Sequence, residues 1–181
     1  MFKKVIVKEY SMYNDLIQHQ PTETSLSFSK QFKLELFTLE QLKPLKVITY
    51  KDDVQARTLI EQKKVDILLN PHLAQGKDPM HSKHSGLNQV LCELARKQDV
   101  AIGITLDTCT TPVALGRIFQ NVVLCRKYHV PLFLFTFAKN PYELRNPKDL
   151  LSFCTLLGMN SSQALTAVSG LTAFLKRKSI K

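Results

Sequence analysis

The sequence has 181 residues, 44% of them hydrophobic, and its 25 Lys and Arg outnumber the 15 Asp and Glu to give a net charge of +10. A chain of this length can bury roughly 70% of its unfolded surface, so we expect one folded domain over residues 1–181. The positive charge favours nucleic acid as a partner over an acidic membrane surface, although a solvated, lysine-rich surface is the simpler alternative. No apolar run approaches the roughly 20 residues that span a bilayer, so we expect a cytoplasmic protein.

The first sixty residues give the weaker signals. Lys4–Val7, Phe32–Phe37 and Val47–Tyr50 contain β-branched or aromatic residues and predict strands. The polar stretch Gln18–Lys30 predicts a loop. Asp52 or Asp53 can cap a helix that continues to Gln62.

From residue 65 onward one pattern repeats, in which a short apolar strand is followed by a polar loop and an amphipathic helix. The predicted strands are Val65–Leu69, Ala101–Leu106 and Val130–Phe137. Their spacing is typical of successive strand–helix units, which build a parallel sheet covered by helices. The sequence therefore predicts an α/β fold.

The helices that follow these strands have clear start signals. An apolar stripe after Gly86 predicts one helix, and Thr111 with Pro112 predicts the start of another that runs to Tyr128. Asn146 and Pro147 repeat that signal for a third helix, which Gly158 ends. Asn160 or Ser161 then opens a single last helix that extends through Leu175 and the basic tail.

The loops after the predicted strands contain no complete catalytic constellation, so we expect no catalytic residue in this chain. His72, Asp78, His81 and His84 could hold zinc or manganese, but a metal site usually draws ligands from several elements. We therefore expect no metal site. Asp66 is expected to face a basic partner or a helix end. The four cysteines lack a C-x-x-C pair, and three of them have the apolar neighbours of small core residues.

Basic residues gather near the ends of the predicted strands. Lys77 and Lys83 lie in the histidine-rich loop, Arg117 lies in the next helix, and Lys139 and Arg145 flank the segment after Phe137. In a parallel sheet these loops lie at one edge, so the pattern predicts a positive rim that contacts RNA phosphates. Scattered surface charge is the alternative.

Several of these segments, taken in order, resemble those of a known family. The resemblance covers residues 47–178 and rests on an ordered series: VDILLNPH at 65–72, GLNQVLCELA at 86–95, VAIGITL at 100–106, RKYHV at 126–130, AK at 138–139, LRNPKDLL at 144–151 and LGM at 157–159. This series is similar to archaeal ribonuclease P protein component 3 and its eukaryotic relatives.

The resemblance implies a TIM-barrel-like fold related to the metal-dependent PHP-class phosphoesterases, and a role as a protein subunit of ribonuclease P. In that enzyme RNA with its Mg²⁺ removes the 5′ leader of precursor tRNA, and the subunit binds and stabilises the catalytic RNA beside another small protein component. Arg117, Lys139 and Arg145 match basic positions of the family. The chain departs from the family in that it begins at what resembles the second strand, and its 181 residues fall below the 200 or more usual for a complete barrel. We therefore expect a barrel that is reduced, open or completed by a partner.

Two functions from different classes follow. The first is the ribonuclease P subunit, with no cofactor of its own. The second is a stand-alone metal-dependent phosphoesterase that would use the histidine-rich loop, residues 72–84.

Overall fold

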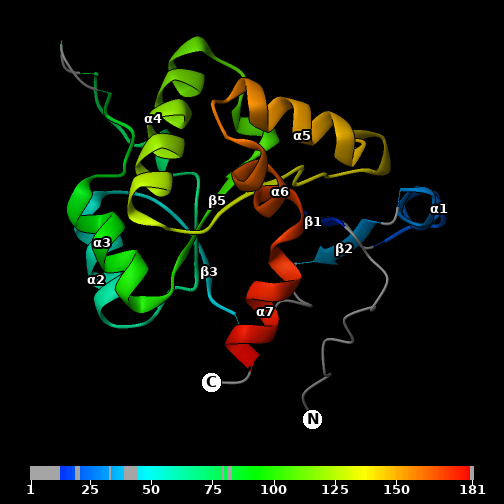
Figure 1. Ribbon diagram of the computed structural model, residues 1–181, viewed down its shortest axis with the longest axis horizontal. Coiled ribbons are helices and arrows are strands. Elements are labelled where there is room, and N and C mark those ends of the chain that lie inside the picture. Colours follow the sequence, from blue (N-terminus) through cyan, green and yellow to red (C-terminus); the bar gives the residue numbers. More distant parts are fainter. Residues whose placement is uncertain are drawn as a thin grey trace.

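Parallel strands form the centre of the protein in its computed structural model (Figure 1). The structure describes residues 13–18, 21–32, 34–38, 45–78, 80 and 83–179. The strands are β1 (Tyr13–Ile17), β2 (Leu34–Thr38), β3 (Val47–Thr49), β4 (Ile67–Leu69), β5 (Ala101–Thr105) and β6 (Leu132–Phe135). The α/β fold predicted from the sequence is confirmed.

Helices occupy most of the connections between strands. They are α1 (Glu23–Gln31), α2 (Asp53–Glu61), α3 (Gln89–Gln98), α4 (Pro112–Tyr128), α5 (Pro147–Leu156), α6 (Ser161–Ser169) and α7 (Leu171–Ser179), with short 3₁₀ turns at Pro71–Leu73, Leu106–Thr108 and Pro141–Glu143. None of the described helices is both long and apolar enough to cross a membrane.

The strands form two hydrogen-bonded groups that meet side by side. β3, β4, β5 and β6 follow one another in a parallel sheet, and β1 pairs with β2 in parallel. Two backbone hydrogen bonds connect β1 to the residues that follow β6. Phe137 N–H donates to Leu16 O at 3.0 Å, and Gln18 N–H donates to Ala138 O at 2.9 Å. This continuous series is consistent with a TIM-barrel-like arrangement.

Each face of the strands has its own apolar core. The larger core packs α2 to α6 against alternate strand residues such as Leu68, Ile102 and Leu134. On the other face, α7 packs on β4 and β6 through residues that include Phe174 and Phe133. Their rings meet edge to face with centroids 5.6 Å apart. Helices therefore cover both sides of the sheet, as expected for buried parallel strands.

Local capping chemistry explains why several helix boundaries agree with the sequence. Thr111 accepts a hydrogen bond from Ala114 N at 3.1 Å and Pro112 opens α4, which ends at Tyr128 as predicted. Asp52 accepts from Gln55 N at 2.7 Å at the start of α2. Asn146 caps α5 in the same manner. These starts need only residues that are near one another in the chain.

The N-terminal region differs from the prediction. Part of the supposed loop at Gln18–Lys30 is helix α1, which a capping box between Thr22 and Ser25 opens. Strand β1 was not predicted from the sequence. It lies beside the end of β6, although an opening strand was expected to be absent. The predicted strand at Lys4–Val7 lies outside the described residues.

The predicted last helix is also two helices rather than one. α6 ends at Ser169, and α7 begins at Leu171, with Gly170 between them. A Cβ at Gly170 would lie 2.5 Å from Thr166 O, so the tight approach at this bend favours glycine. The bend brings the tail back to the sheet, where Lys178 Nζ pairs with Asp66 at 3.0 Å. The basic partner predicted for Asp66 is thus confirmed.

Candidate nucleic-acid interface

The end of β4 is fixed to the end of β5 by a buried amide. Asn70 adopts a left-handed conformation with φ of 54° and turns its side chain toward β5. Its Oδ1 accepts from Thr105 N and its Nδ2 donates to Thr105 Oγ1, both at 2.9 Å. These two hydrogen bonds satisfy the Thr105 N–H and the Asn70 side-chain amide at the carboxyl edge of the sheet, so Asn70 has a structural role.

His72 is buried directly behind this edge as a neutral imidazole. Burial, together with the nearby Arg117 charge, lowers the pKa of His72 to about 4. Thr108 gives its hydroxyl hydrogen to Thr105 O at 2.6 Å, so the 2.9 Å contact with His72 has Nε2 as the donor. The opposite nitrogen, Nδ1, has no partner among the described residues.

Arg117 is a structural residue that holds the loop between β4 and α3 against α4. Arg117 is only 8% exposed, and its Nε donates to Asp78 Oδ1 at 2.8 Å. The two terminal nitrogens donate to the carbonyls of His72, Ala74 and Gly76 at 2.7 to 3.3 Å. With its donors directed at protein groups, Arg117 is poorly placed for the RNA contact predicted from the sequence.

Asp78 is the acidic partner of this loop. A hydrogen bond from His84 N–H and the Arg117 guanidinium hold the pKa of Asp78 below its usual value. Lys83 Nζ lies 3.9 Å from the same carboxylate. Lys77 and Lys83 are both exposed, but Lys83 thus has an acidic neighbour that competes with phosphate.

Two residues of the alternative metal site have other partners in the folded chain. Asp78 binds Arg117, and His72 binds Thr108, while His81 lies outside the described residues. In the described part of the chain, no three His, Cys, Asp or Glu side chains are grouped so as to hold a metal ion.

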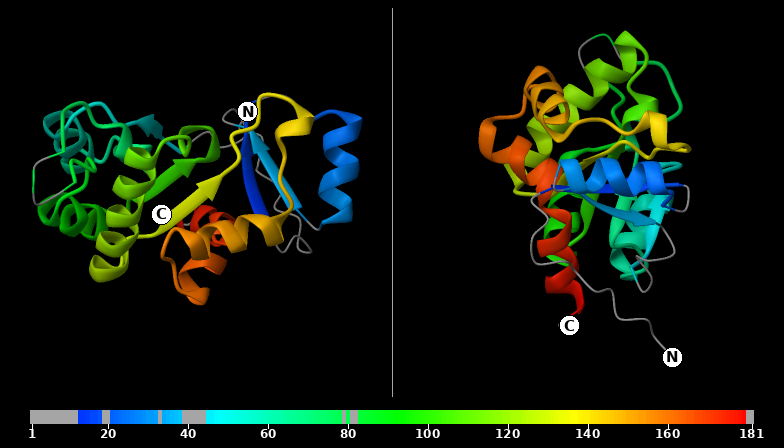
Figure 2. Two further views of the ribbon diagram at one scale, coloured as in Figure 1. Left: turned by 90° about the horizontal axis from the view of Figure 1, so that it is seen from above. Right: turned by 90° about the vertical axis from the view of Figure 1, so that its right-hand side faces the viewer.

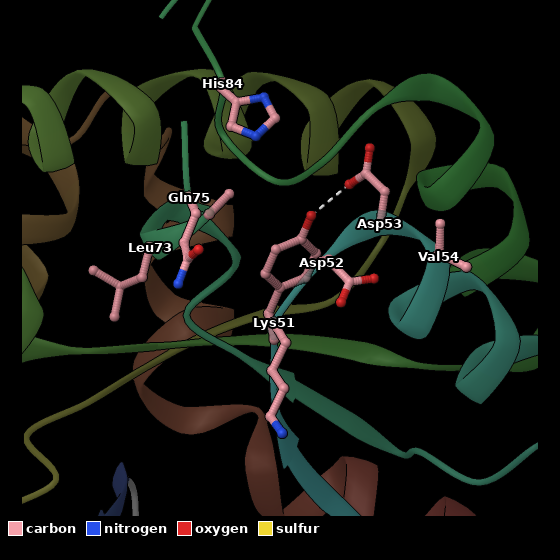
Figure 3. A pocket seen from close by; sticks show the side chains of 9 residues that line it. Lys51, Asp52, Asp53, Val54, Leu73, Gln75 and His84 are labelled. Atoms are coloured by element: carbon pink, nitrogen blue, oxygen red, sulfur yellow. Dashed lines mark hydrogen bonds between the residues drawn. The ribbon is translucent and has the colours of Figure 1, made fainter. Parts of the chain in front are cut away.

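The carboxyl edge near β3 and β4 carries an acidic hollow of about 620 Å³. Figure 3 shows Asp52 and Asp53 on one side of this hollow, and Leu73 and Gln75 on the other. Tyr50 donates its hydroxyl to Asp53, and burial with this carboxylate raises the pKa of Tyr50 well above its usual value. Lys51 also lines the hollow and offsets one of the two carboxylates, so the lining has a net negative charge, which disfavours RNA phosphate.

The loop between β6 and α5 presents its cations to solvent. Lys139 and Arg145 are exposed, and the described residues give neither side chain an acidic partner within ion-pairing distance. The nearby Glu143 carboxylate is occupied by Lys139 N–H at 2.7 Å and Asn140 Nδ2 at 2.6 Å. Arg145 donates one terminal nitrogen to the Tyr142 and Leu144 carbonyls, which orients the guanidinium along the loop.

Two further residues extend this surface, and the sequence analysis missed both. Tyr142 is 85% exposed and lies three residues before Arg145. Lys148 is exposed in the first turn of α5. An aromatic residue among loop cations is the signal that could have identified them, because exposed rings stack on unpaired bases.

The loop between β6 and α5 is anchored to the N-terminal strands. Asp15 of β1 is fully buried and accepts hydrogen bonds from the amide and hydroxyl of Thr136, which lies just after β6. Burial raises the pKa of this carboxyl group to about 7. Leu144 then packs against Ile17 and Ala138 beneath the loop. The cations therefore project from a fixed base.

The predicted basic residues do not form one continuous rim. Lys139 and Arg145 share one loop, and Lys77 and Lys83 share another. Figures 1 and 2 place the loop after β6 beside β1, β2 and α1, and the loop after β4 at the far side of α4. The acidic hollow also lies on the carboxyl edge, beside β3.

More than half of this chain is similar in sequence to known archaeal proteins. The chain is 39% identical over 119 residues to ribonuclease P protein component 3 of Methanosarcina mazei, which covers 62% of this chain and 46% of the relative. It is 34% identical over 107 residues to the protein of the same name from Methanocaldococcus jannaschii, covering 56% of this chain and 43% of the relative. The chain resembles archaeal ribonuclease P protein component 3. The family resemblance predicted from the sequence is thus confirmed.

A solved structure shares the fold of this chain. A chain in the cryo-EM structure of archaeal ribonuclease P with mature tRNA aligns with a TM-score of 0.62 at 20% identity, over 92% of this chain and 81% of that chain. No family model matches the sequence. The aligned regions span slightly less than half the length of the component 3 relatives named above.

Proposed function

We propose that this chain is a protein subunit of ribonuclease P that binds and stabilises the catalytic RNA. The observation that carries the proposal is the similarity to component 3 over 119 residues. The geometry supports it, because the β6–α5 loop fixes its backbone by internal hydrogen bonds and leaves Lys139 and Arg145 facing solvent. Such cations suit phosphate contacts that position RNA without reading its sequence.

In this proposal the chain acts as a single domain, and RNA with its bound Mg²⁺ carries out the cleavage. The immediate partner is the ribonuclease P RNA, and precursor tRNA is reached through the holoenzyme in the cytoplasm. Another small protein component binds beside this chain. Cations on the protein neutralise phosphate repulsion, so the RNA needs less divalent ion to fold.

A reconstituted cleavage assay tests the proposal. Nuclease-free protein alone should leave precursor tRNA intact. Added to cognate catalytic RNA with the other protein components, it should raise the cleavage rate or lower the Mg²⁺ needed for half-maximal cleavage. Robust cleavage by the RNA-free protein would contradict the proposal, and so would a complete assembly whose rate and Mg²⁺ requirement do not change when this chain is left out.

A further inference from the structure

A second hollow lies between the C-terminal ends of α3 and α4, away from the β6–α5 loop. It has a volume of about 590 Å³ and is lined by Glu93, Arg96, Lys97 and Tyr128. α3 and α4 pack side by side, and each leads directly into the next strand. The hollow is therefore at the amino edge of the sheet, whereas the β6–α5 loop follows the carboxyl end of β6.

The charge of this second hollow is positive. Arg96 and Lys97 are exposed, and no ion pair involves either of them among the described residues. Lys127 Nζ lies 5.3 Å from the centre of the Tyr128 ring, which adds a third cation beside the hollow. The single carboxylate in the lining, Glu93, accepts a hydrogen bond from Gln89 at 3.2 Å.

Helix stabilisation alone does not account for this arrangement. Cations near a helix C-terminus interact favourably with the helix dipole. However, both helices already end in backbone caps, since Asp99 and His129 adopt left-handed conformations and return their N–H groups to the last carbonyls. Asp99, the nearby acid, is bound by Arg177 at 2.7 Å rather than by Arg96 or Lys97.

We propose that the hollow lined by Arg96, Lys97 and Tyr128 is a second RNA-binding site that holds a phosphodiester segment of an RNA strand. Arginine can bind a phosphate through two parallel N–H groups, and lysine adds a point charge. A tyrosine at the same place can contact an unpaired base or a ribose. This inference rests on the proposed function, and it adds that RNA contacts the protein at both edges of the sheet.

The test measures the affinity of the full-length protein for a transcript of the catalytic RNA at several KCl concentrations. The variant is Arg96→Gln/Lys97→Gln, which keeps good helix formers and removes two charges. The matched control is Lys30→Gln/Lys51→Gln, which removes two exposed charges elsewhere. Circular dichroism checks the fold of each protein, and ultraviolet crosslinking of the wild type to the RNA maps contacts without any substitution.

We expect the Arg96/Lys97 variant to bind about tenfold more weakly, with a salt slope reduced by roughly 1.4–1.8, while the control stays near wild type. We also expect crosslinked peptides to include Tyr128. If the Arg96/Lys97 variant binds like wild type and no crosslink falls at this hollow, while Lys139→Gln/Arg145→Gln weakens binding, the second site is wrong and the proposed function stands. A wild type that binds no catalytic RNA would overturn both.

Discussion

Basic residues predicted from the sequence to touch RNA lie at the loop after β4 and at the loop after β6, yet their side chains have different partners. At the first loop, Arg117 of α4 binds Asp78 and three backbone carbonyls of the loop and is almost fully buried. In the second, the Lys139 N–H and the Asn140 side-chain amide occupy Glu143, and Lys139 and Arg145 face solvent. The partners available to a cation thus decide whether it builds the fold or is free to bind RNA.

The largest expected effect is a loss of stability at Arg117, the buried cation. Arg117→Ala leaves three carbonyls without their donor, so the free energy of unfolding should fall by about 2–4 kcal/mol. Urea denaturation followed by circular dichroism measures the loss. Arg117→Lys should recover little of it, because an ammonium group cannot reach all the acceptors that the guanidinium fork spans. A stable Arg117→Ala protein with weakened RNA binding would reverse the assignment.

The second prediction concerns the base of the β6–α5 loop, where Asp15 bonds to Thr136. Because the pKa of Asp15 rises from 3.8 to about 7 on folding, the folded state binds more protons between these values. The free energy of unfolding should therefore fall as pH rises from about 4 to 7, by at most about 1.4 kcal/mol per pH unit from this group.

Asp15→Asn isolates that contribution. The variant should lack the decline due to this carboxyl group, so the stability difference between variant and wild type should grow in favour of the variant as pH rises. Equilibrium denaturation at several pH values measures the difference. Parallel pH profiles for the two proteins would show that Asp15 does not titrate in this range.

A smaller effect is expected at the C-terminal helix. Lys178→Ala removes the 3.0 Å ion pair with Asp66, a 3.9 Å contact with Asp99 and a cation–π contact with Phe174, and it should reduce the free energy of unfolding by roughly 0.5–1 kcal/mol. Lys176→Ala is the matched control, because Lys176 is exposed in the same turn. Both variants are compared by thermal denaturation. If they lose equal stability, the contacts of Lys178 with Asp66, Asp99 and Phe174 contribute nothing measurable.

The smallest expected effect on stability is at the proposed interface. Lys139→Gln/Arg145→Gln changes exposed loop side chains, and each substitution should alter the free energy of unfolding by less than about 0.5 kcal/mol. The same urea titration that detects the Arg117→Ala loss measures it. A large loss here would make these residues structural.

Residues that are close in the chain explain what could be predicted from the sequence. The cap formed by Thr111 and Pro112 and the cap at Asp52 depend on neighbours within one turn, so both helix starts were correct. The contact between Asp15 and Thr136 joins residues 121 apart, and neither position carries a local signal for it. The same limit hid strand β1, which is defined by its neighbours β2 and β6 rather than by its own composition.

The candidate site was predictable only in part for the same reason. The sequence identified Lys139 and Arg145, which remain exposed, but it could not distinguish them from Arg117, whose partners come from a loop about 40 positions away. It also predicted one rim where an acidic hollow occupies part of the carboxyl edge. Charge can be counted in a sequence, whereas burial and the choice of partner are set by the fold.

The most direct test is the salt dependence of catalytic-RNA binding by wild type and the Lys139→Gln/Arg145→Gln variant, with folding verified for each. If these two cations contact phosphates, the variant should bind more weakly and its salt slope should fall by roughly 1.4–1.8. Identical affinities and slopes in two folded proteins would contradict the account.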